Sequence, residues 1–241
     1  MKGKIKLILG CMFSGKTSEL ISRYNRYTIG KKKCLMIKYK NDTRYDKNMI
    51  VTHDGIKISA VVCKNLYEVD HKINNYDVIC IDEVQFYKDA DIFCDKWATE
   101  NNKIVEACGL NSTFERKPFP IISNLIPLVE DITFLTAICK ENGNDAVYSK
   151  RLIDDKKEEL IGGSDVYSAV DRETYFKDIS TKDNFQKFIK IYNESHNIKI
   201  SKILENKFIR HFESLKDKNK PYRDIILECF KLYGRTARYL N

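Results

Sequence analysis

The stretch IKLILGCMFSGKTSEL, residues 5–20, decides the fold of this chain. It opens with a β-prone run and continues into the loop Gly10, Cys11, Met12, Phe13, Ser14, Gly15, Lys16 and Thr17, which has the glycine spacing and the Lys-Thr pair of a phosphate-binding loop. A helical pattern follows from Thr17 to Tyr27. In this order, strand, loop and helix direct backbone N–H groups and the positive end of the helix dipole at phosphate groups. We therefore predict a nucleotide phosphate site, with Lys16 near the transferred phosphoryl group and the Thr17 hydroxyl on Mg²⁺.

A second motif supplies the acidic groups that such a site needs. Residues 77–81 form an apolar, strand-like run, and Asp82 and Glu83 follow directly. In an open α/β sheet, ligands collect beyond the carboxyl ends of the strands. We expect Asp82 to face the Mg²⁺ and its water shell, and Glu83 to accept the proton of the attacking nucleophile as the catalytic base. An acidic pair at a strand end is often only a solvated turn, so this interpretation depends on the neighbouring loop.

Strand-like and helical segments alternate along the front of the chain. Further short apolar runs lie at 34–39, 77–81, 103–108 and 131–137, and a second helical pattern lies at 90–97. This alternation predicts an α/β fold of the P-loop NTPase kind, with helices flanking a mostly parallel sheet. We assign residues 1–138 to this domain. Residues 139–176 should form a small loop-rich subdomain, because turn signals dominate there.

Residues 177–241 form the third expected part, a basic helical extension. Lys and Arg outnumber Asp and Glu by 15 to 8 from Phe176 onward, whereas the preceding residues are nearly neutral; the whole chain carries a net charge of +8. Apolar stripes predict helices around 185–192, 204–215 and 221–233. Two interpretations stay open: a helical appendage packed on the core, which we favour, or a surface for nucleic acid or another partner.

The composition excludes several classes of protein. Of the 241 residues, 43% are apolar and 32% are charged, as in globular proteins with a sizeable core. No apolar run reaches the roughly 20 residues that span a bilayer, and the N-terminus lacks the apolar stretch of a signal peptide, so we expect neither membrane insertion nor secretion. The eight cysteines are scattered without a Cys-x-x-Cys pair. This favours buried thiols in a reducing, cytoplasmic compartment.

The chain resembles the thymidine kinases of the cytosolic and poxvirus type over about residues 3–176. The resemblance rests on the loop and on further blocks in the same order: NDTRY at 41–45, THD at 52–54, DEVQF at 82–86, TFERKPF at 113–119, SKRL at 149–152 and IGGSDVY at 161–167. It implies transfer of the γ-phosphoryl group of ATP to the 5′-hydroxyl of thymidine, giving dTMP, in the presence of Mg²⁺. It also implies a homo-oligomer, usually a tetramer.

The resemblance assigns roles to individual residues. Glu83 corresponds to the catalytic base, and Asp42 and Arg44 lie on the ATP side. Arg44 and Arg151 correspond to phosphate-side cations, for which a surface salt bridge is an equal alternative. The residues implied around the nucleoside are Met12, Phe86, Leu110, Thr113, Phe114, Phe119, Glu158, Glu159, Leu160, Ile161, Gly162 and Tyr167. Among them, Phe114 would stack on the base, residues 158–162 would form a lasso whose backbone reads the thymine edge, and Tyr167 would hold the sugar.

The chain departs from the family pattern at three places. Family members usually bind zinc beneath the lasso through two Cys-x-x-Cys pairs, whereas the matching positions here are Cys139, Asn142, Asp171 and Thr174. This set is a poor tetrahedral zinc site, and we predict no structural zinc. Val84 and the pair Asn111-Ser112 replace a usual glycine and a usual Asp-Gly. Because a valine does not easily adopt positive φ, we expect the loop after Glu83 to sit differently.

Two other functions compete with that of a thymidine kinase. DEVQ at 82–85 also fits a nucleic-acid-dependent P-loop ATPase, with Glu83 activating water, although we find no second motor lobe in the sequence. The altered Val84 and the lost zinc ligands also fit a catalytically degenerate nucleoside-binding module. We favour the active kinase, with thymidine as its small-molecule partner, and expect neither a membrane nor a nucleic-acid partner.

Overall fold

The computed structural model describes residues 3–42, 49–51, 57–153, 157, 160–177 and 210. The chain divides into two compact units, Met1–Tyr175 and Phe176–Asn241. Of the expected C-terminal helices only Arg210 is described, and it is helical; the rest lies outside the described residues. No helix in the described ranges is both long and apolar enough to cross a membrane.

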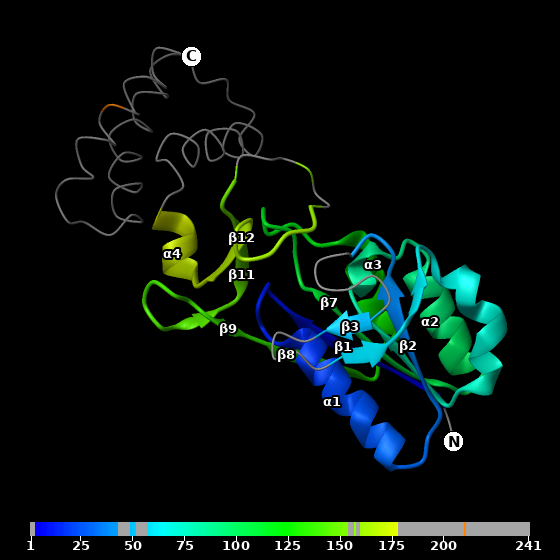
Figure 1. The fold of residues 1–241 in the computed structure, drawn as a ribbon. Coiled ribbons are helices and arrows are strands. Elements are labelled where there is room, and N and C mark those ends of the chain that lie inside the picture. Colours follow the sequence, from blue (N-terminus) through cyan, green and yellow to red (C-terminus); the bar gives the residue numbers. More distant parts are fainter. Residues whose placement is uncertain are drawn as a thin grey trace, which may run out of the picture. The chain divides into compact units, whose positions relative to one another are not determined.

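A six-stranded sheet forms the centre of the first unit (Figure 1). Its strands, in the order in which they pair, are β5 (Val61–Cys63), β2 (Cys34–Tyr39), β6 (Val78–Ile81), β7 (Ile104–Leu110), β1 (Lys4–Gly10) and β8 (Asp131–Leu135). Every neighbouring pair is parallel. The predicted α/β fold with a mostly parallel sheet is thus confirmed.

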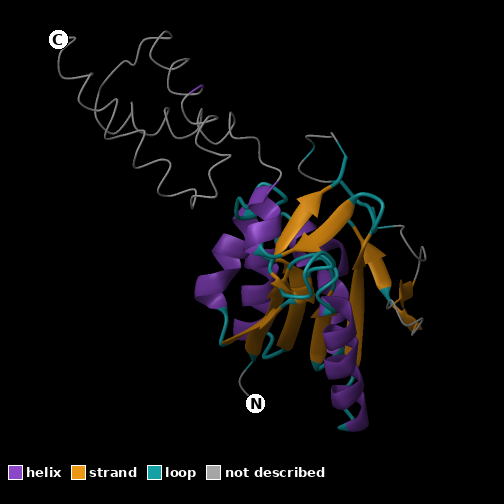
Figure 2. Ribbon diagram, turned by 90° about the vertical axis from the view of Figure 1, so that its left-hand side faces the viewer, coloured by secondary structure: helices purple, strands orange, loops and turns teal. Residues whose placement is uncertain are grey.

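Helices cover both faces of this sheet (Figure 2). One face carries α1 (Lys16–Ile29), and the other carries α2 (Ala90–Thr99), α3 (Pro120–Leu125) and the 3₁₀ helix η1 (Leu66–Asn75). Two short 3₁₀ helices are η2 (Val84–Phe86) and η3 (Ile126–Leu128). The two predicted helices are present, and each is slightly longer than its sequence pattern.

Alternating side chains of the strands pack against the two helical layers. Leu7 and Leu9 of β1 lie in the cluster with α2 and α3, whereas Ile8 lies with Leu20 and Ile21 of α1. All are buried. Each such side chain contributes about 1.5–3 kcal/mol when it leaves water. Burial on both faces explains why these strands appear in the sequence as apolar runs.

Smaller pairs of strands lie beside the sheet. They are β3 (Met49–Val51) with β4 (Lys57–Ser59), β9 (Ala137–Ile138) with β10 (Asp145–Ala146), and β11 (Tyr148–Arg151) with β12 (Tyr167–Val170), followed by the helix α4 (Arg172–Lys177). The predicted strand 131–137 is divided into β8 and β9. Its pairing ends where Leu135 faces Gly10, because β1 turns into the loop at that residue.

The cysteines are free thiols wherever the structure describes them. The buried ones are Cys11, Cys63, Cys80, Cys94, Cys108 and Cys139, and Cys34 is half-buried. The prediction of buried thiols is therefore confirmed for the described cysteines other than Cys34.

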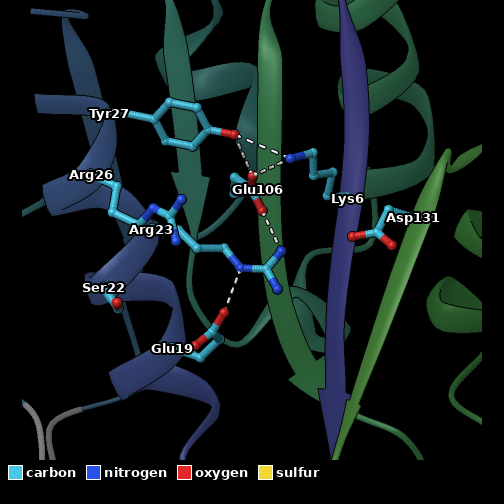
Figure 3. A pocket seen from close by; sticks show the side chains of 8 residues that line it. All are labelled: Lys6, Glu19, Ser22, Arg23, Arg26, Tyr27, Glu106 and Asp131. Carbon is cyan, nitrogen blue, oxygen red and sulfur yellow. Dashed lines mark hydrogen bonds and ion pairs between the residues drawn. The ribbon is translucent and has the colours of Figure 1, made fainter. Parts of the chain in front are cut away.

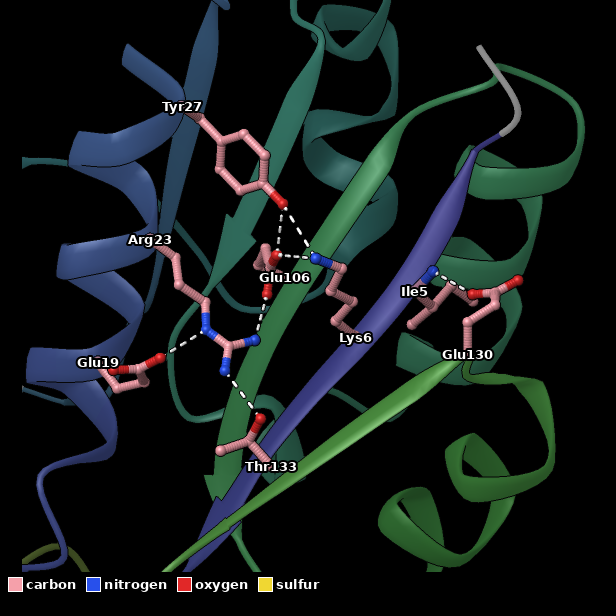
Figure 4. Close-up of polar contacts among 8 residues, drawn as sticks. All are labelled: Ile5, Lys6, Glu19, Arg23, Tyr27, Glu106, Glu130 and Thr133. Carbon is pink, nitrogen blue, oxygen red and sulfur yellow. Dashed lines mark hydrogen bonds and ion pairs between the residues drawn. The ribbon is translucent and has the colours of Figure 1, made fainter. Parts of the chain in front are cut away.

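A charged network lies between α1 and the sheet (Figure 4). The fully buried carboxylate of Glu106, on β7, accepts hydrogen bonds from Arg23 Nη1 at 2.9 Å and from the Tyr27 hydroxyl at 2.7 Å, and Lys6 Nζ lies 3.4 Å away. Arg23 also donates to Thr133 Oγ1 of β8. The network therefore ties one helix to three adjacent strands.

Arg23 faces a polar cavity of about 520 Å³ between α1 and the strands β1, β7 and β8 (Figure 3). Arg26, one helical turn later, lines the same cavity but is exposed. The dashed contacts in Figure 3 reach Arg23 and not Arg26. These two arginines therefore differ in burial and in pairing while sharing a helix face.

We predict that Arg23→Met lowers the free energy of unfolding by about 2–4 kcal/mol, because the buried Glu106 carboxylate loses its strongest cationic partner. The matched change Arg26→Met should lower it by less than about 1 kcal/mol. Urea unfolding at neutral pH measures both. Equal effects of the two substitutions would contradict the role of the network.

Candidate active site

The phosphate-binding loop joins β1 to α1 and requires glycine at both of its glycine positions. At Gly10, an added Cβ would lie 2.4 Å from the carbonyl oxygen of Leu135 and 2.5 Å from Ser14 Oγ. Gly15 has a φ of 80°, a left-handed conformation that glycine adopts without steric penalty. Phe13 also has a positive φ, of 63°. The spacing seen in the sequence thus follows from the backbone geometry of the loop.

Lys16 and Thr17, the first residues of α1, direct their side chains at neighbouring oxygen atoms. Lys16 Nζ donates to the carbonyl oxygen of Cys11 at 2.6 Å. Thr17 Oγ1 donates to Asp82 Oδ1 at 3.2 Å. The lysine ammonium is thus held at the loop, and the threonine hydroxyl lies next to the acid that follows β6. Oxygen ligands of this kind fit Mg²⁺.

The Asp82 carboxylate is buried and accepts hydrogen bonds from three directions. Besides Thr17, the backbone N–H of Glu83 donates to Oδ1 at 3.1 Å, and the Cys108 thiol of β7 donates to it at 2.9 Å. Burial, together with the adjacent Asp82 charge, raises the pKa of the Cys108 thiol well above its usual value. The thiol therefore stays protonated and can act as the donor.

Glu83 has a left-handed backbone, with φ 54° and ψ 45°. A non-glycine residue in this region is under strain and is commonly found at functional sites. In the loop where the sequence replaces the family's glycine, the positive φ falls on Glu83, and Val84 begins η2 as a fully buried core residue. Val84 therefore needs no positive φ, and its side chain packs in the core.

Gln85 fixes the Glu83 side chain relative to β7. Its Nε2 donates to Glu83 Oε2 at 2.6 Å, and its Oε1 accepts from the backbone N–H of Leu110 at 3.0 Å. An added Cβ at Gly109 would lie 2.5 Å from the same Oε1. Gln85 lies within the DEVQF block, but no local signal in the sequence points to this role.

One pocket gathers most of the residues expected around the nucleoside, and Glu83 lies on its wall. The expected lining residues that it contains are Met12, Phe86, Leu110, Thr113, Phe114, Phe119, Leu160, Ile161, Gly162 and Tyr167. Ser112, Ser149 and Arg151 also line it. These residues come from separate parts of the chain, which the fold brings to one place.

Arg151, for which a phosphate-side cation and a surface salt bridge were equal expectations, lines this pocket. Its guanidinium lies 3.7 Å from the centre of the Phe114 ring and donates hydrogen bonds to the Tyr167 hydroxyl and to the carbonyl oxygen of Lys157. The Tyr167 hydroxyl in turn donates to the carbonyl oxygen of Leu160 at 2.8 Å. Because Arg151 covers one face of the Phe114 ring, a base can stack in this arrangement only on the other face.

Two hydrogen bonds connect the phosphate-binding loop to the strands beside the pocket. The Cys11 thiol donates to the carbonyl oxygen of Ala146, and the backbone N–H of Met12 donates to Ser149 Oγ at 2.9 Å. Burial raises the pKa of the Cys11 thiol, so it remains a donor. The sequence did not reveal these contacts, because the partners lie more than a hundred residues apart.

The four residues at the family's zinc positions are bonded to one another or to the backbone. Asn142 Nδ2 donates to Asp171 Oδ2 at 2.9 Å, the backbone N–H of Thr174 donates to Asp171 Oδ1 at 2.9 Å, and Cys139 Sγ lies 3.4 Å from Thr174 Oγ1. The Thr174 amide and the Asn142 side chain hold the pKa of the Asp171 carboxyl well below its usual range. A donor set with one thiol, in which the carboxylate already accepts amide hydrogen bonds, does not fit zinc.

The remaining expected site residues do not join the pocket or are not described. Asp42 is buried, and its carboxylate pairs with Lys38 at 3.5 Å. Arg44, Glu158 and Glu159 lie outside the described residues.

The chain is similar to known proteins along most of its length. The family model for thymidine kinase matches residues 3–175. Thymidine kinase 1 of Dictyostelium discoideum is 44% identical over 198 residues, which cover 80% of this chain and 86% of that protein. The thymidine kinase of sheeppox virus is 47% identical over 174 residues, covering 72% of this chain and 97% of that protein. Among solved structures, the replication initiator DnaA bound to AMPPCP and single-stranded DNA aligns at 11% identity over 98% of this chain and 59% of that chain, with a TM-score of 0.34, which is too low to support a conclusion. The sequence matches establish that the chain belongs to the thymidine kinase family.

Proposed function

We propose that this chain transfers the γ-phosphoryl group of ATP to the 5′-hydroxyl of thymidine, giving dTMP, with Glu83 as the catalytic base. The observation that carries the assignment of Glu83 is its position. Glu83 follows Asp82, whose carboxylate accepts a hydrogen bond from Thr17 of the phosphate-binding helix. The side chain of Glu83 itself lies on the wall of the aromatic pocket. A nucleoside bound in that pocket would place its nucleophile next to Glu83, on the side of the pocket that faces the phosphates.

The phosphate side works by positioning and charge. The backbone N–H groups of the loop and the N-terminus of α1 would bind the phosphates. Lys16 would exchange the carbonyl of Cys11 for a phosphate oxygen and stabilise the negative charge that spreads over the transferred group. Thr17 and Asp82 would hold Mg²⁺ directly or through its water shell. The ion, when bound, neutralises charge on the β- and γ-phosphates.

The nucleoside side provides stacking and backbone recognition. Phe114 offers one ring face to the base, while Arg151 holds the other face. The backbone of the described lasso residues 160–162 would contact the edge of the base, with the carbonyl of Leu160 fixed by the Tyr167 hydroxyl. Met12, which belongs to the phosphate-binding loop, and Glu83, the proposed base, line the same pocket, which supports phosphoryl transfer to a nucleoside over hydrolysis of ATP by water.

We predict that Glu83→Gln lowers kcat for thymidine by about 10²- to 10⁴-fold, because the amide keeps the shape of the side chain but cannot accept the 5′-hydroxyl proton. The KM for ATP should change little. Glu68→Gln, the same chemical change at an exposed helix cap, should leave kcat unchanged. Steady-state kinetics with ATP and thymidine measure kcat and KM of both variants. Full activity of Glu83→Gln would disprove the role of Glu83 as the catalytic base.

We further propose that no zinc binds beneath the lasso. The support is the hydrogen-bonded set of Cys139, Asn142, Asp171 and Thr174, which already satisfies its own polar groups. These contacts connect the β9–β10 hairpin to the start of α4, and a hydrogen-bonded connection of this kind needs no metal.

Purified protein should therefore contain far less than one zinc per chain by elemental analysis. Its unfolding temperature should not change after treatment with a zinc chelator such as 1,10-phenanthroline, because no bound metal contributes to folding. A stoichiometric zinc, or a clear fall in the unfolding temperature on chelation, would contradict the proposal.

We also propose a homo-oligomer, which the family resemblance suggests is a tetramer, in the cytoplasm. The edge strand β8 exposes Ile132 and Phe134 to 43% and 50%, and an apolar strand edge of this kind is suited to pairing with another copy. The free thiols fit a reducing compartment. A solution mass of a single chain by light scattering would contradict the oligomer.

A further inference from the structure

The loop that carries Phe114 is a tight turn, and a side chain from outside the turn bonds to one of its carbonyl groups. Within the turn, the backbone N–H of Thr113 donates to the carbonyl of Lys117, and that of Arg116 donates to the carbonyl of Thr113. The carbonyl oxygen of Phe114 instead accepts a hydrogen bond from the Tyr175 hydroxyl at 2.7 Å. This contact joins residues separated by 61 positions in the sequence.

Tyr175 is held from several sides. The backbone N–H of Tyr175 donates to the carbonyl oxygen of Asp171. The side chain of Asp171 also caps α4, by accepting the backbone N–H of Thr174. The Tyr175 ring packs against that of Tyr148, with 5.3 Å between the centres, and the Arg116 guanidinium lies 5.0 Å from its centre. The hydroxyl therefore reaches the Phe114 loop from a supported position.

Tyr175 is not among the residues that line the nucleoside pocket, whereas Phe114 is. A shift of the Phe114 backbone would move its ring relative to the guanidinium of Arg151, which lies against the ring. The hydroxyl of Tyr175 is therefore linked to the pocket through its hydrogen bond to Phe114.

We propose that Tyr175 is a positioning residue for nucleoside recognition: its hydrogen bond to the Phe114 carbonyl sets the place of the ring on which the base stacks. This inference rests on the proposed role of the pocket in binding thymidine. It assigns to α4 a function in substrate affinity, and it predicts that the hydroxyl acts on the nucleoside and not on ATP.

The test is Tyr175→Phe, which removes the hydroxyl and keeps the ring. The KM for thymidine should rise about two- to tenfold, the effect of losing one neutral hydrogen bond, while the KM for ATP and kcat stay near the wild-type values. The matched control is Tyr148→Phe, which removes a hydroxyl from the adjacent ring. That variant should leave all three constants unchanged, because the Tyr148 contacts that the structure describes are made by its ring and backbone.

The outcomes are distinct. Both variants are first compared with wild type by thermal unfolding, and kinetics are measured below the lowest midpoint. An unchanged thymidine KM in Tyr175→Phe, an equal rise in Tyr148→Phe, a parallel rise in the KM for ATP, or a Tyr175→Phe chain that does not fold would overturn the proposal. Wild-type protein that does not phosphorylate thymidine would instead refute the proposed function itself.

Discussion

Hydrogen-bond donors from different parts of the chain meet at the carboxylate of Asp82, and the rest of the site is built around this point. Thr17 brings the phosphate-binding helix, Cys108 brings β7, and the N–H of Glu83 brings the turn that carries the proposed base. They meet because β1, β7 and β6 are parallel neighbours and end at the same edge of the sheet. A carboxylate buried at this edge would be costly without its donors, and the donors therefore fix the turn after β6 as well as satisfying the acid.

From this point the site extends toward the pocket through hydrogen bonds in which polar side chains meet other side chains or backbone N–H groups. Gln85 links the Glu83 carboxylate to the N–H of Leu110, and Ser149 accepts the N–H of Met12. Glu83, the phosphate-binding loop and the pocket wall are thus connected by hydrogen bonds. The strained backbone of Glu83 is retained because these neighbours and the buried Val84 hold it.

The sequence predicted those features of the fold and the site that depend on neighbouring residues in the chain. The β1–loop–α1 unit and the acids after β6 could be recognised because glycine geometry, helix periodicity and an apolar run are local signals. The position of Arg151 was not predictable in this way, since its partners Phe114 and Tyr167 are brought to it by the fold. For the same reason the sequence could show that the family's zinc ligands are missing, but not that Asp171 would accept hydrogen bonds in their place. That Glu83, and not Val84, takes the positive φ could not be read from the sequence, because sequence alone does not tell which of two adjacent residues adopts that conformation.

The central claim is that the pocket beside Glu83 holds a nucleoside that receives the phosphoryl group. A panel of nucleosides offered to the full chain with ATP and Mg²⁺ tests it most directly, with product nucleotides separated and quantified and ATP hydrolysis followed in parallel, with and without single-stranded DNA. The account predicts rapid formation of dTMP from thymidine, with little hydrolysis in the absence of a nucleoside and no stimulation by DNA. ATP hydrolysis that DNA stimulates, without phosphorylation of any nucleoside, would contradict it.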